Sequence, residues 1–203
     1  NTADFVQVEG RYTNRNWSGG ARRLDISGAI GNLFVSGLSG VLIFRDVLHD
    51  VDGDRSEFTQ PTWRASADFR QPWFRSERNT GGAGVFASRR SAPGIFVDRT
   101  YGTTGTFTRL FAERAPASLT YRFELNRVLA GDIYFCVNYG VCDLPTVSAL
   151  QQQQRMSPLT LSGSIDRSNG SLNPTAGYLV RAELEHASAF TLSDYRYNRA
   201  SAD

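Results

Sequence analysis

Apolar and polar residues alternate one by one along much of this chain, which is the pattern of a β-strand with two different faces. Between Trp63 and Phe69, apolar side chains at every second position alternate with Arg64, Ser66 and Asp68. The same alternation recurs in the ranges 22–31, 119–128, 159–166 and 178–185. Helical periodicity is scarce, so the pattern predicts an all-β chain.

The connections between these runs alternate in length. Short turns are predicted at 16–20, 75–79, 113–118 and 172–177, and longer connections at 32–60, 92–100 and 132–157. Short turns at one end of the strands and longer loops at the other are typical of outer-membrane β-barrels. Several runs last about 9 to 12 residues, long enough for a tilted strand to cross a bilayer. The sequence therefore predicts an antiparallel transmembrane β-barrel.

The polar faces carry charges of both signs, as the water-filled lumen of a barrel allows. The predicted lumen-facing charges are Arg64, Asp68, Arg122, Glu124, Arg181 and Glu183. They either pack against a loop inserted into the lumen or stabilise the barrel by pairing across strands, and we favour the second role. Aromatic residues near the strand ends resemble an interfacial girdle, namely Trp17, Trp63, Trp73, Phe74 and Tyr178. A soluble β-sandwich would also show alternation, and it stays as the alternative fold.

Composition and charge exclude several function classes. The net charge is +2 and the basic residues are dispersed, so no nucleic-acid partner is predicted. No apolar run is long enough for a transmembrane helix. The chain opens on Asn1 without a signal peptide, so we expect its start to be processed, trimmed or unobserved.

No catalytic constellation stands out, so we predict no enzyme, no cofactor and no metal. His49 and His186 are isolated histidines, for which a structural role is the usual one. Asp50, Asp52 and Asp54 lack the residue order of a calcium loop. The simplest interpretation of that acidic segment is a solvated loop, and a weak cation or lipopolysaccharide-bridging role is the alternative.

The two cysteines of the chain, Cys136 and Cys142, are close together in the sequence. The five residues between them include Asn and Gly and can turn back easily, so a small disulfide-closed loop is one interpretation. It would imply an oxidising compartment. Two unpaired thiols are the alternative.

Three segments resemble the outer-membrane assembly-factor superfamily, which includes the barrel insertases of the BAM and TAM complexes, bacterial surface antigens and two-partner secretion transporters. The segment from Asn14 to Leu24 is similar to an early turn of that family, and the segment from Phe69 to Phe74 to the end of its fourth strand. The third segment, 164–181, contains Asn173, Pro174 and Gly177, which resemble the family's Asn-Pro-x-x-Gly periplasmic turn.

The resemblance implies a fold and a location. Residues 1–203 would form a partial outer-membrane barrel domain of about nine strands, the second to tenth of roughly sixteen, without a periplasmic POTRA domain. The implied strands are 4–13, 21–31, 62–74, 80–91, 100–112, 118–130, 158–169, 177–191 and 195–203. Both cysteines would lie in the fourth extracellular loop. Nine strands would not close this barrel, so we expect a fragment, a part of a longer protein or one half of a split barrel.

The resemblance also implies a function and partners. The expected function is non-enzymatic assistance in the insertion of other proteins into the outer membrane of a Gram-negative bacterium. The expected partners are outer-membrane lipid and lipopolysaccharide, unfolded outer-membrane protein clients, and periplasmic or lipoprotein accessory subunits. The alternatives are a two-partner-secretion-type transporter, a structural outer-membrane subunit of a larger complex, and a soluble β-sandwich binding module.

Overall fold

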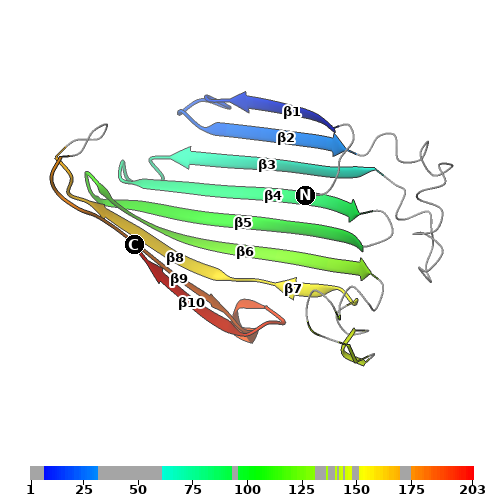
Figure 1. Cartoon of the computed structure of the whole chain (residues 1–203). Coiled ribbons are helices and arrows are strands. Elements are labelled where there is room, and N and C mark those ends of the chain that lie inside the picture. The colour runs from blue at the N-terminus through cyan, green and yellow to red at the C-terminus, as the bar shows by residue number, and fades with distance from the viewer. Residues whose placement is uncertain are drawn as a thin grey trace.

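In a computed structural model, the described residues form one antiparallel sheet of ten strands (Figure 1). These residues are 7–31, 61–92, 96–130, 136, 140, 142–143, 145–147, 151–169 and 175–203. The strands are β1 (Gln7–Asn14), β2 (Arg23–Gly31), β3 (Thr62–Pro72), β4 (Asn79–Ala92), β5 (Phe96–Ala112), β6 (Ala115–Ala130), β7 (Gln154–Met156), β8 (Leu159–Asp166), β9 (Leu179–Ala187) and β10 (Tyr197–Ala202). A short 3-10 helix, η1 (Ala189–Thr191), lies between β9 and β10.

The strands follow one another in the sheet in the order of the sequence, and β7 is the exception. β7 and β8 lie end to end beside β6, where β7 pairs with residues 124–126 and β8 with residues 117–121. Ser157 and Pro158 interrupt this combined strand, and the backbone amide of Arg122 donates to the Pro158 carbonyl over 3.1 Å. The sheet therefore has nine crossing strands in a meander, and the prediction of an all-β antiparallel fold is confirmed.

Some predicted strand ends were wrong. β6 begins at Ala115, inside the predicted turn 113–118. Pro116 suggested a break, but it pairs with Leu110 beside a register shift between Leu110 and Ala112, and such a bulge tolerates a residue without an amide hydrogen. β5 begins at Phe96, inside the predicted connection 92–100, and β7 lies inside the predicted loop 132–157.

The sheet is staggered, as a tilted barrel wall requires. One continuous row of directly paired residues starts at Asn14, the last residue of β1, and ends at His186 and Asn198. β1 ends at Asn14 toward the short turns of the sheet, whereas β9 runs the other way and ends one residue after His186, toward what we call the loop end (Figure 1). Eight steps of about 4.8 Å at a tilt of roughly 40° shift such a row by about 25 Å along a barrel axis. This shift equals the usual height of a barrel's apolar band, about 25 Å.

The described chain forms a single layer with a very small core. Its buried apolar side chains are Ala29, Val97, Ala130, Val147 and Ala187. A soluble domain stacks a second layer on its apolar face, but no second layer covers this sheet within the described ranges. The sheet is also open, because β1 and β10 each pair with one neighbour.

Candidate functional site: the polar inner face of the sheet

Strand pairing divides the side chains between two faces, which we call the outer face and the inner face. The outer face carries most of the large apolar side chains; exposed examples include Val85 (55%), Tyr101 (47%) and Leu161 (49%). The inner face carries hydroxyls, glycines and charges. Along β5 the two faces alternate strictly, with exposed residues at 101, 103, 105, 107 and 109 and half-buried ones at 102, 104, 106, 108 and 110. On this stretch of β5 the outer face is therefore the more exposed one, and exposed large apolar side chains on an outer face are the reverse of the arrangement in a soluble domain.

Hydroxyl groups line the middle of the inner face. Thr106 and Thr120 share a hydrogen bond of 3.2 Å between β5 and β6, and Thr108 and Ser118 share one of 2.8 Å. Across β8 and β9, the Thr160 hydroxyl donates to Glu185 over 3.4 Å. Cross-strand hydroxyl pairs of this kind hold neighbouring strands in register and leave a surface that water wets.

Two of the predicted charges on the inner face have partners that the sequence alone did not identify. Arg64 reaches across β2, over the small side chain of Ala29, to a carboxylate oxygen of Glu9 at 3.1 Å. Glu183 pairs at 3.0 Å with Arg199 of β10. Both are cross-strand pairs.

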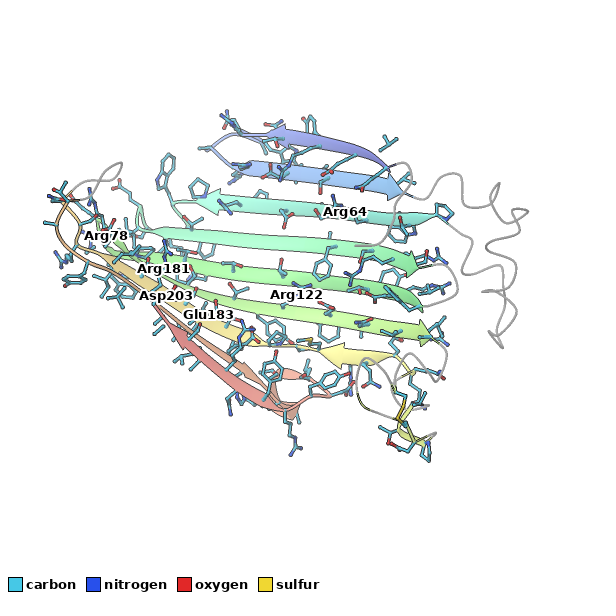
Figure 2. All side chains as sticks on the ribbon, in the orientation of Figure 1. Arg64, Arg78, Arg122, Arg181, Glu183 and Asp203 are labelled. Atoms are coloured by element: carbon cyan, nitrogen blue, oxygen red, sulfur yellow. A yellow bond between two sulfur atoms is a disulfide. The ribbon has the colours of Figure 1, made fainter. Side chains whose placement is uncertain are left out.

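The other predicted charges differ in their surroundings. Arg122 and Glu124 form an ion pair of 2.6 Å within β6, because side chains two residues apart share a face. Asp68 and Arg181 lie on the inner face, and no ion pair joins either of them to another described residue. Figure 2 shows Arg181, Glu183 and Asp203 gathered beside β8 to β10, with Arg64 and Arg122 farther along the sheet.

Glycines make room for larger groups on the inner face. A Cβ atom at Gly84 would lie 2.5 Å from Oδ1 of Asp68 and 2.7 Å from Oγ1 of Thr104. A Cβ atom at Gly102 would meet the ring of Phe86, and the guanidinium of Arg122 lies 4.5 Å from the centre of that ring. An open hollow of about 400 Å³ includes Gly82 in its lining, together with Asp25, Asp68, Arg70, Thr80, Thr104, Thr106 and Thr108. The inner face is thus a furrowed, water-accessible surface.

The turn between β8 and β9 is organised by Asn169, which the sequence analysis did not single out as a site residue. Its side-chain oxygen accepts hydrogen bonds from the amides of Thr175 and Ala176 over 3.0 and 3.1 Å. Gly177 has φ +110°, and a Cβ atom there would lie 2.6 Å from the Cα atom of Ser168, so glycine is required at this position. The predicted turn residues Asn173 and Pro174 lie outside the described residues.

Aromatic side chains gather where the outer face meets the short turns. Exposed rings there belong to Trp17, Trp73, Phe74, Phe111 and Tyr178. The guanidinium groups of Arg75 and Arg109 lie 5.7 Å and 5.6 Å from the rings of Phe74 and Phe111. Amphipathic rings and long cationic side chains favour the boundary between apolar lipid and water. This end of the sheet has the composition of a membrane interface.

Groups suited to metal binding do not cluster within the described part of the chain. His186 is held by hydrogen-bonding contacts to Asn198 (2.7 Å) and Ser188 (2.9 Å). His49, Asp50, Asp52 and Asp54 lie outside the described residues. No helix in the described ranges is long and apolar enough to cross a membrane.

A family model, the Omp85 superfamily domain, matches residues 16–203. This chain belongs to the Omp85 superfamily. The match covers nearly the whole sequence and agrees with the family resemblance seen in its turns. A comparison with curated proteins found no match. Omp85 domains are β-barrels of the outer membrane, and the superfamily includes both insertases and transporters.

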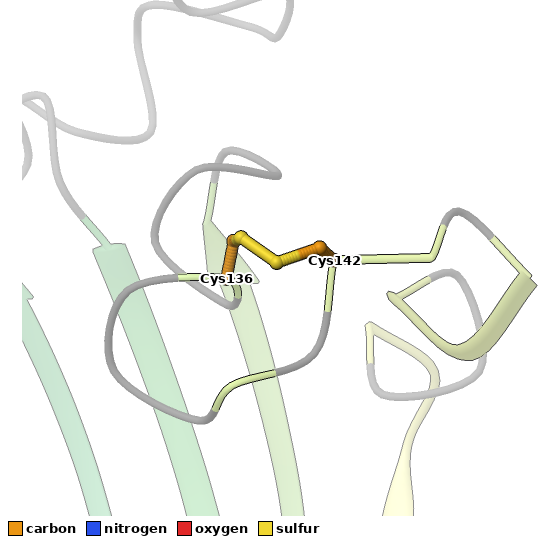
Figure 3. The surroundings of a disulfide bond; sticks show 2 residues. All are labelled: Cys136 and Cys142. Carbon is orange, nitrogen blue, oxygen red and sulfur yellow. A yellow bond between two sulfur atoms is a disulfide. The ribbon is translucent and has the colours of Figure 1, made fainter.

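The Omp85 chain carries a disulfide beyond the end of β6. Cys136 and Cys142 are bonded, and their Cα atoms lie 4.4 Å apart (Figure 3). The bond closes a small ring at the loop end of the sheet. An outer-membrane location provides the oxidising environment in which such a bond persists.

The disulfide predicts how Cys136 and Cys142 react with a maleimide label. Native protein unfolded in denaturant without reductant is expected to take up no maleimide, because both cysteines of the chain are bonded. After reduction it should take up two labels, measured by intact mass. The Cys136→Ser variant should take up one label without reductant. Two labels on unreduced native protein would contradict the bond.

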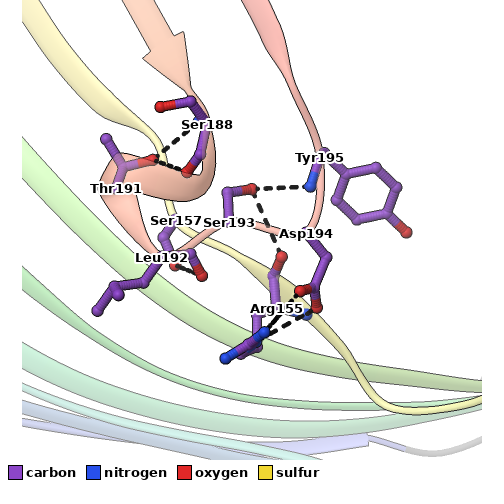
Figure 4. A network of polar contacts seen from close by, with 8 residues as sticks. All are labelled: Arg155, Ser157, Ser188, Thr191, Leu192, Ser193, Asp194 and Tyr195. Carbon is purple, nitrogen blue, oxygen red and sulfur yellow. Dashed lines mark hydrogen bonds and ion pairs between the residues drawn. The ribbon is translucent and has the colours of Figure 1, made fainter.

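The loop between β9 and β10 is fastened to β7, and sequence reasoning missed this contact because the loop has no periodic pattern. The Arg155 guanidinium pairs with Asp194 at 2.9 Å, and each backbone amide of this pair donates to the other residue (Figure 4). The amide of Ser188 donates to the hydroxyl of Thr191 over 3.0 Å. Phe190 belongs to η1 within this fastened loop and is 90% exposed.

This fastening predicts a dependence on pH. Hydrogen bonds from the Arg155 side chain and backbone, together with its charge, hold the pKa of Asp194 below its ordinary value. Because the pKa of Asp194 is lower in the folded loop than in the unfolded chain, its contacts stabilise the folded loop at pH values above the unfolded pKa of about 3.9. That stabilisation is lost as the pH falls through the folded-state pKa.

Hydrogen exchange of residues 188–196, corrected for intrinsic rates, should therefore be steady from pH 7 to 5 and faster below about pH 4. The Asp194→Asn variant should exchange faster at neutral pH and lose the acid-dependent step. An acid-dependent step of the same size in this variant would assign the titration to another group.

Proposed function

We propose that this Omp85 chain forms part of the wall of an outer-membrane barrel that assists the insertion of other proteins into that membrane, without enzymatic chemistry. One observation carries the proposal: a chain of this superfamily exposes its apolar face outward and keeps its hydroxyls and charges on the inner face. Such a wall fits lipid on one side and water on the other.

The inner face supports a path for polypeptide rather than a site for one small molecule. Its hydroxyl pairs join β5 to β6, a hydroxyl of β8 donates to Glu185, and its charged side chains include exposed ones such as Arg64 and Arg122. Hydroxyls and mixed charges solvate an unfolded chain without binding one sequence tightly. The free energy for insertion would come from the client itself, whose apolar strands leave water for lipid.

The test uses the full-length protein reconstituted into phosphatidylcholine vesicles, with a urea-unfolded outer-membrane protein as client. We expect the client to fold faster than in empty vesicles, measured by the heat-dependent shift of its gel mobility. Vesicles that contain an unrelated porin at equal density serve as the control for bilayer defects. Equal folding rates in all three preparations would contradict the proposal.

A planar-bilayer recording separates the insertase from the transporter. The insertase proposal expects client folding to accelerate without a steady open conductance. A stable open channel combined with no acceleration would instead assign the chain to the two-partner-secretion type. Co-purification at fixed stoichiometry with a non-barrel protein, again without acceleration, would assign a structural role in a larger complex.

A further inference from the structure

The loop between β9 and β10, which contains η1, lies against the outer face of the sheet. Tyr121 of β6 donates its hydroxyl to the Thr191 carbonyl over 2.9 Å, and a ring nitrogen of His186 lies 2.9 Å from the Ser188 hydroxyl. Both Tyr121 and His186 occupy the outer face, because the register pairs each of them with Leu159 of that face. The loop therefore belongs to the side of the sheet that faces lipid in the proposed barrel.

The position of η1 along the barrel axis is that of a membrane border. Tyr178 lies at the opposite border, among the aromatic side chains near the short turns, and its carbonyl accepts from the Arg167 amide over 2.8 Å. The ten-residue step from Tyr178 to Ser188 spans roughly 34 Å along a strand and about 26 Å along the axis at a tilt of about 40°. The apolar band of a barrel is about 25 Å tall. Ser188 and the helix that follows it thus lie at the loop-end border of that band.

The loop has the hydrogen bonding that apolar surroundings require (Figure 4). The backbone amides of Ser188 and of residues 191–195 all donate within the chain. The Leu192 carbonyl accepts from the hydroxyl of Ser157 over 3.4 Å, and Asp194, the one acidic residue of the loop, is held in its ion pair. Lipid offers no partner to a backbone group, so a loop in contact with lipid must satisfy its polar groups internally.

The loop exposes large apolar side chains around η1. Phe190 is 90% exposed, the highest value for a large apolar side chain among the described residues, and Leu192 is 58% exposed. Leu192 has φ +70°, a left-handed conformation in which a helix end ordinarily places glycine or asparagine. Exposed apolar side chains on a backbone that hydrogen bonds hold in place indicate a surface that another molecule covers.

We propose that the loop between β9 and β10 is a lipid anchor in the outer leaflet, with the Phe190 ring inserted at the boundary between headgroups and acyl chains. Lipid is favoured over a protein partner because the loop continues the apolar outer face and lies at the height of its border. Phenylalanine and leucine are typical of elements that lie in this boundary. The inference rests on the proposed outer-membrane placement, with the loop end outward, and adds a lipid contact made by a loop.

The test uses tryptophan as a reporter of depth. The Phe190→Trp variant of the full protein is reconstituted into phosphatidylcholine vesicles whose acyl chains carry bromine either near the headgroup or near the bilayer centre. The emission of the parent is subtracted to isolate the added tryptophan. We expect this added emission to shift to shorter wavelength and to be quenched most by bromine near the headgroup. Iodide on both sides of the bilayer should leave it nearly unchanged.

Two further variants calibrate the signal. In Leu161→Trp the new ring lies on the apolar outer face, so bromine near the bilayer centre should quench it most. In Arg181→Trp the new ring lies on the inner face of β9, the strand that leads into the loop, and iodide alone should quench it.

Two outcomes would overturn the inference. Quenching of Phe190→Trp by iodide rather than by brominated lipid would place the loop in water. Protection from both quenchers would assign Phe190 to a protein contact instead. A failure of the proposed barrel placement is distinguishable, because brominated lipid would then leave Leu161→Trp unquenched as well.

Discussion

An arginine in place of Leu161 is expected to destabilise the membrane-inserted protein by about 2–4 kcal/mol, the cost of a charge near the bilayer midplane on the lipid face of a barrel. Leu161 lies on the outer face between Leu119 and Leu184, its paired neighbours on β6 and β9. All three side chains are about half exposed and form one apolar stripe. The measurement is urea-induced unfolding in phosphatidylcholine vesicles, followed by tryptophan fluorescence.

The adjacent residue supplies the matched control. Ser162 lies on the inner face, where its direct neighbours are Ser118 and Glu183. An arginine there would remain in water beside a carboxylate, so Ser162→Arg should change the free energy of unfolding by less than about 1 kcal/mol. The two positions lie on the same strand and at about the same depth in the membrane, but on opposite faces of the sheet. Equal losses of stability at both positions would contradict the assignment of the two faces. A larger loss at Ser162 would reverse it.

Alternation determined which residues share a face, and this part of the fold was predictable. Arg64, Asp68 and Arg122 all lie on the inner face, as the two-residue period requires. The same period fixes the apolar positions of β6 and β8. Strand ends were less predictable, because Pro116 breaks the pattern without breaking the strand.

Which charged side chains meet depends on the register between neighbouring strands. The alternation of apolar and polar residues does not reveal that register. Arg64 meets Glu9 because the registers of β1, β2 and β3 bring them to the same level and because Ala29 between them is small. Likewise, the contact between Arg155 and Asp194 joins a strand to a loop, and neither segment shows a period that indicates it. These contacts require the tertiary structure.

Phe86 and Gly102 are a second case in which register decides the packing. They are direct partners on the inner faces of β4 and β5, and the ring of Phe86 covers the glycine. An aromatic ring laid over a cross-strand glycine shields backbone that would otherwise be exposed. Arg122 of β6 covers the ring in turn, with 4.5 Å between its guanidinium and the ring centre. The side chains of Phe86 and Arg122 thereby connect β4, β5 and β6 over Gly102, which has no side chain of its own.

Gly102→Ala is therefore expected to destabilise the inserted barrel by about 1–3 kcal/mol, as overpacking does elsewhere. The added Cβ atom would lie 2.8 Å from Cε1 of Phe86 and 2.7 Å from the backbone oxygen of Phe123. Gly105→Ala is the control, since it lies on the same strand but the outer face and a Cβ there meets nothing within 4 Å. It should change the free energy of unfolding by less than about 0.5 kcal/mol.

A double-mutant cycle separates the two contacts at Gly102. Because Phe86→Ala removes the ring, adding Gly102→Ala to it should cost about 0.5–3 kcal/mol less than adding it to the parent. The remaining cost would report the approach to the Phe123 carbonyl, which no side-chain change relieves. All four proteins would be compared by urea titration in the same vesicles. Additive losses would mean that the ring of Phe86 moves away freely and that it does not join β4 to β5 and β6 as the register implies.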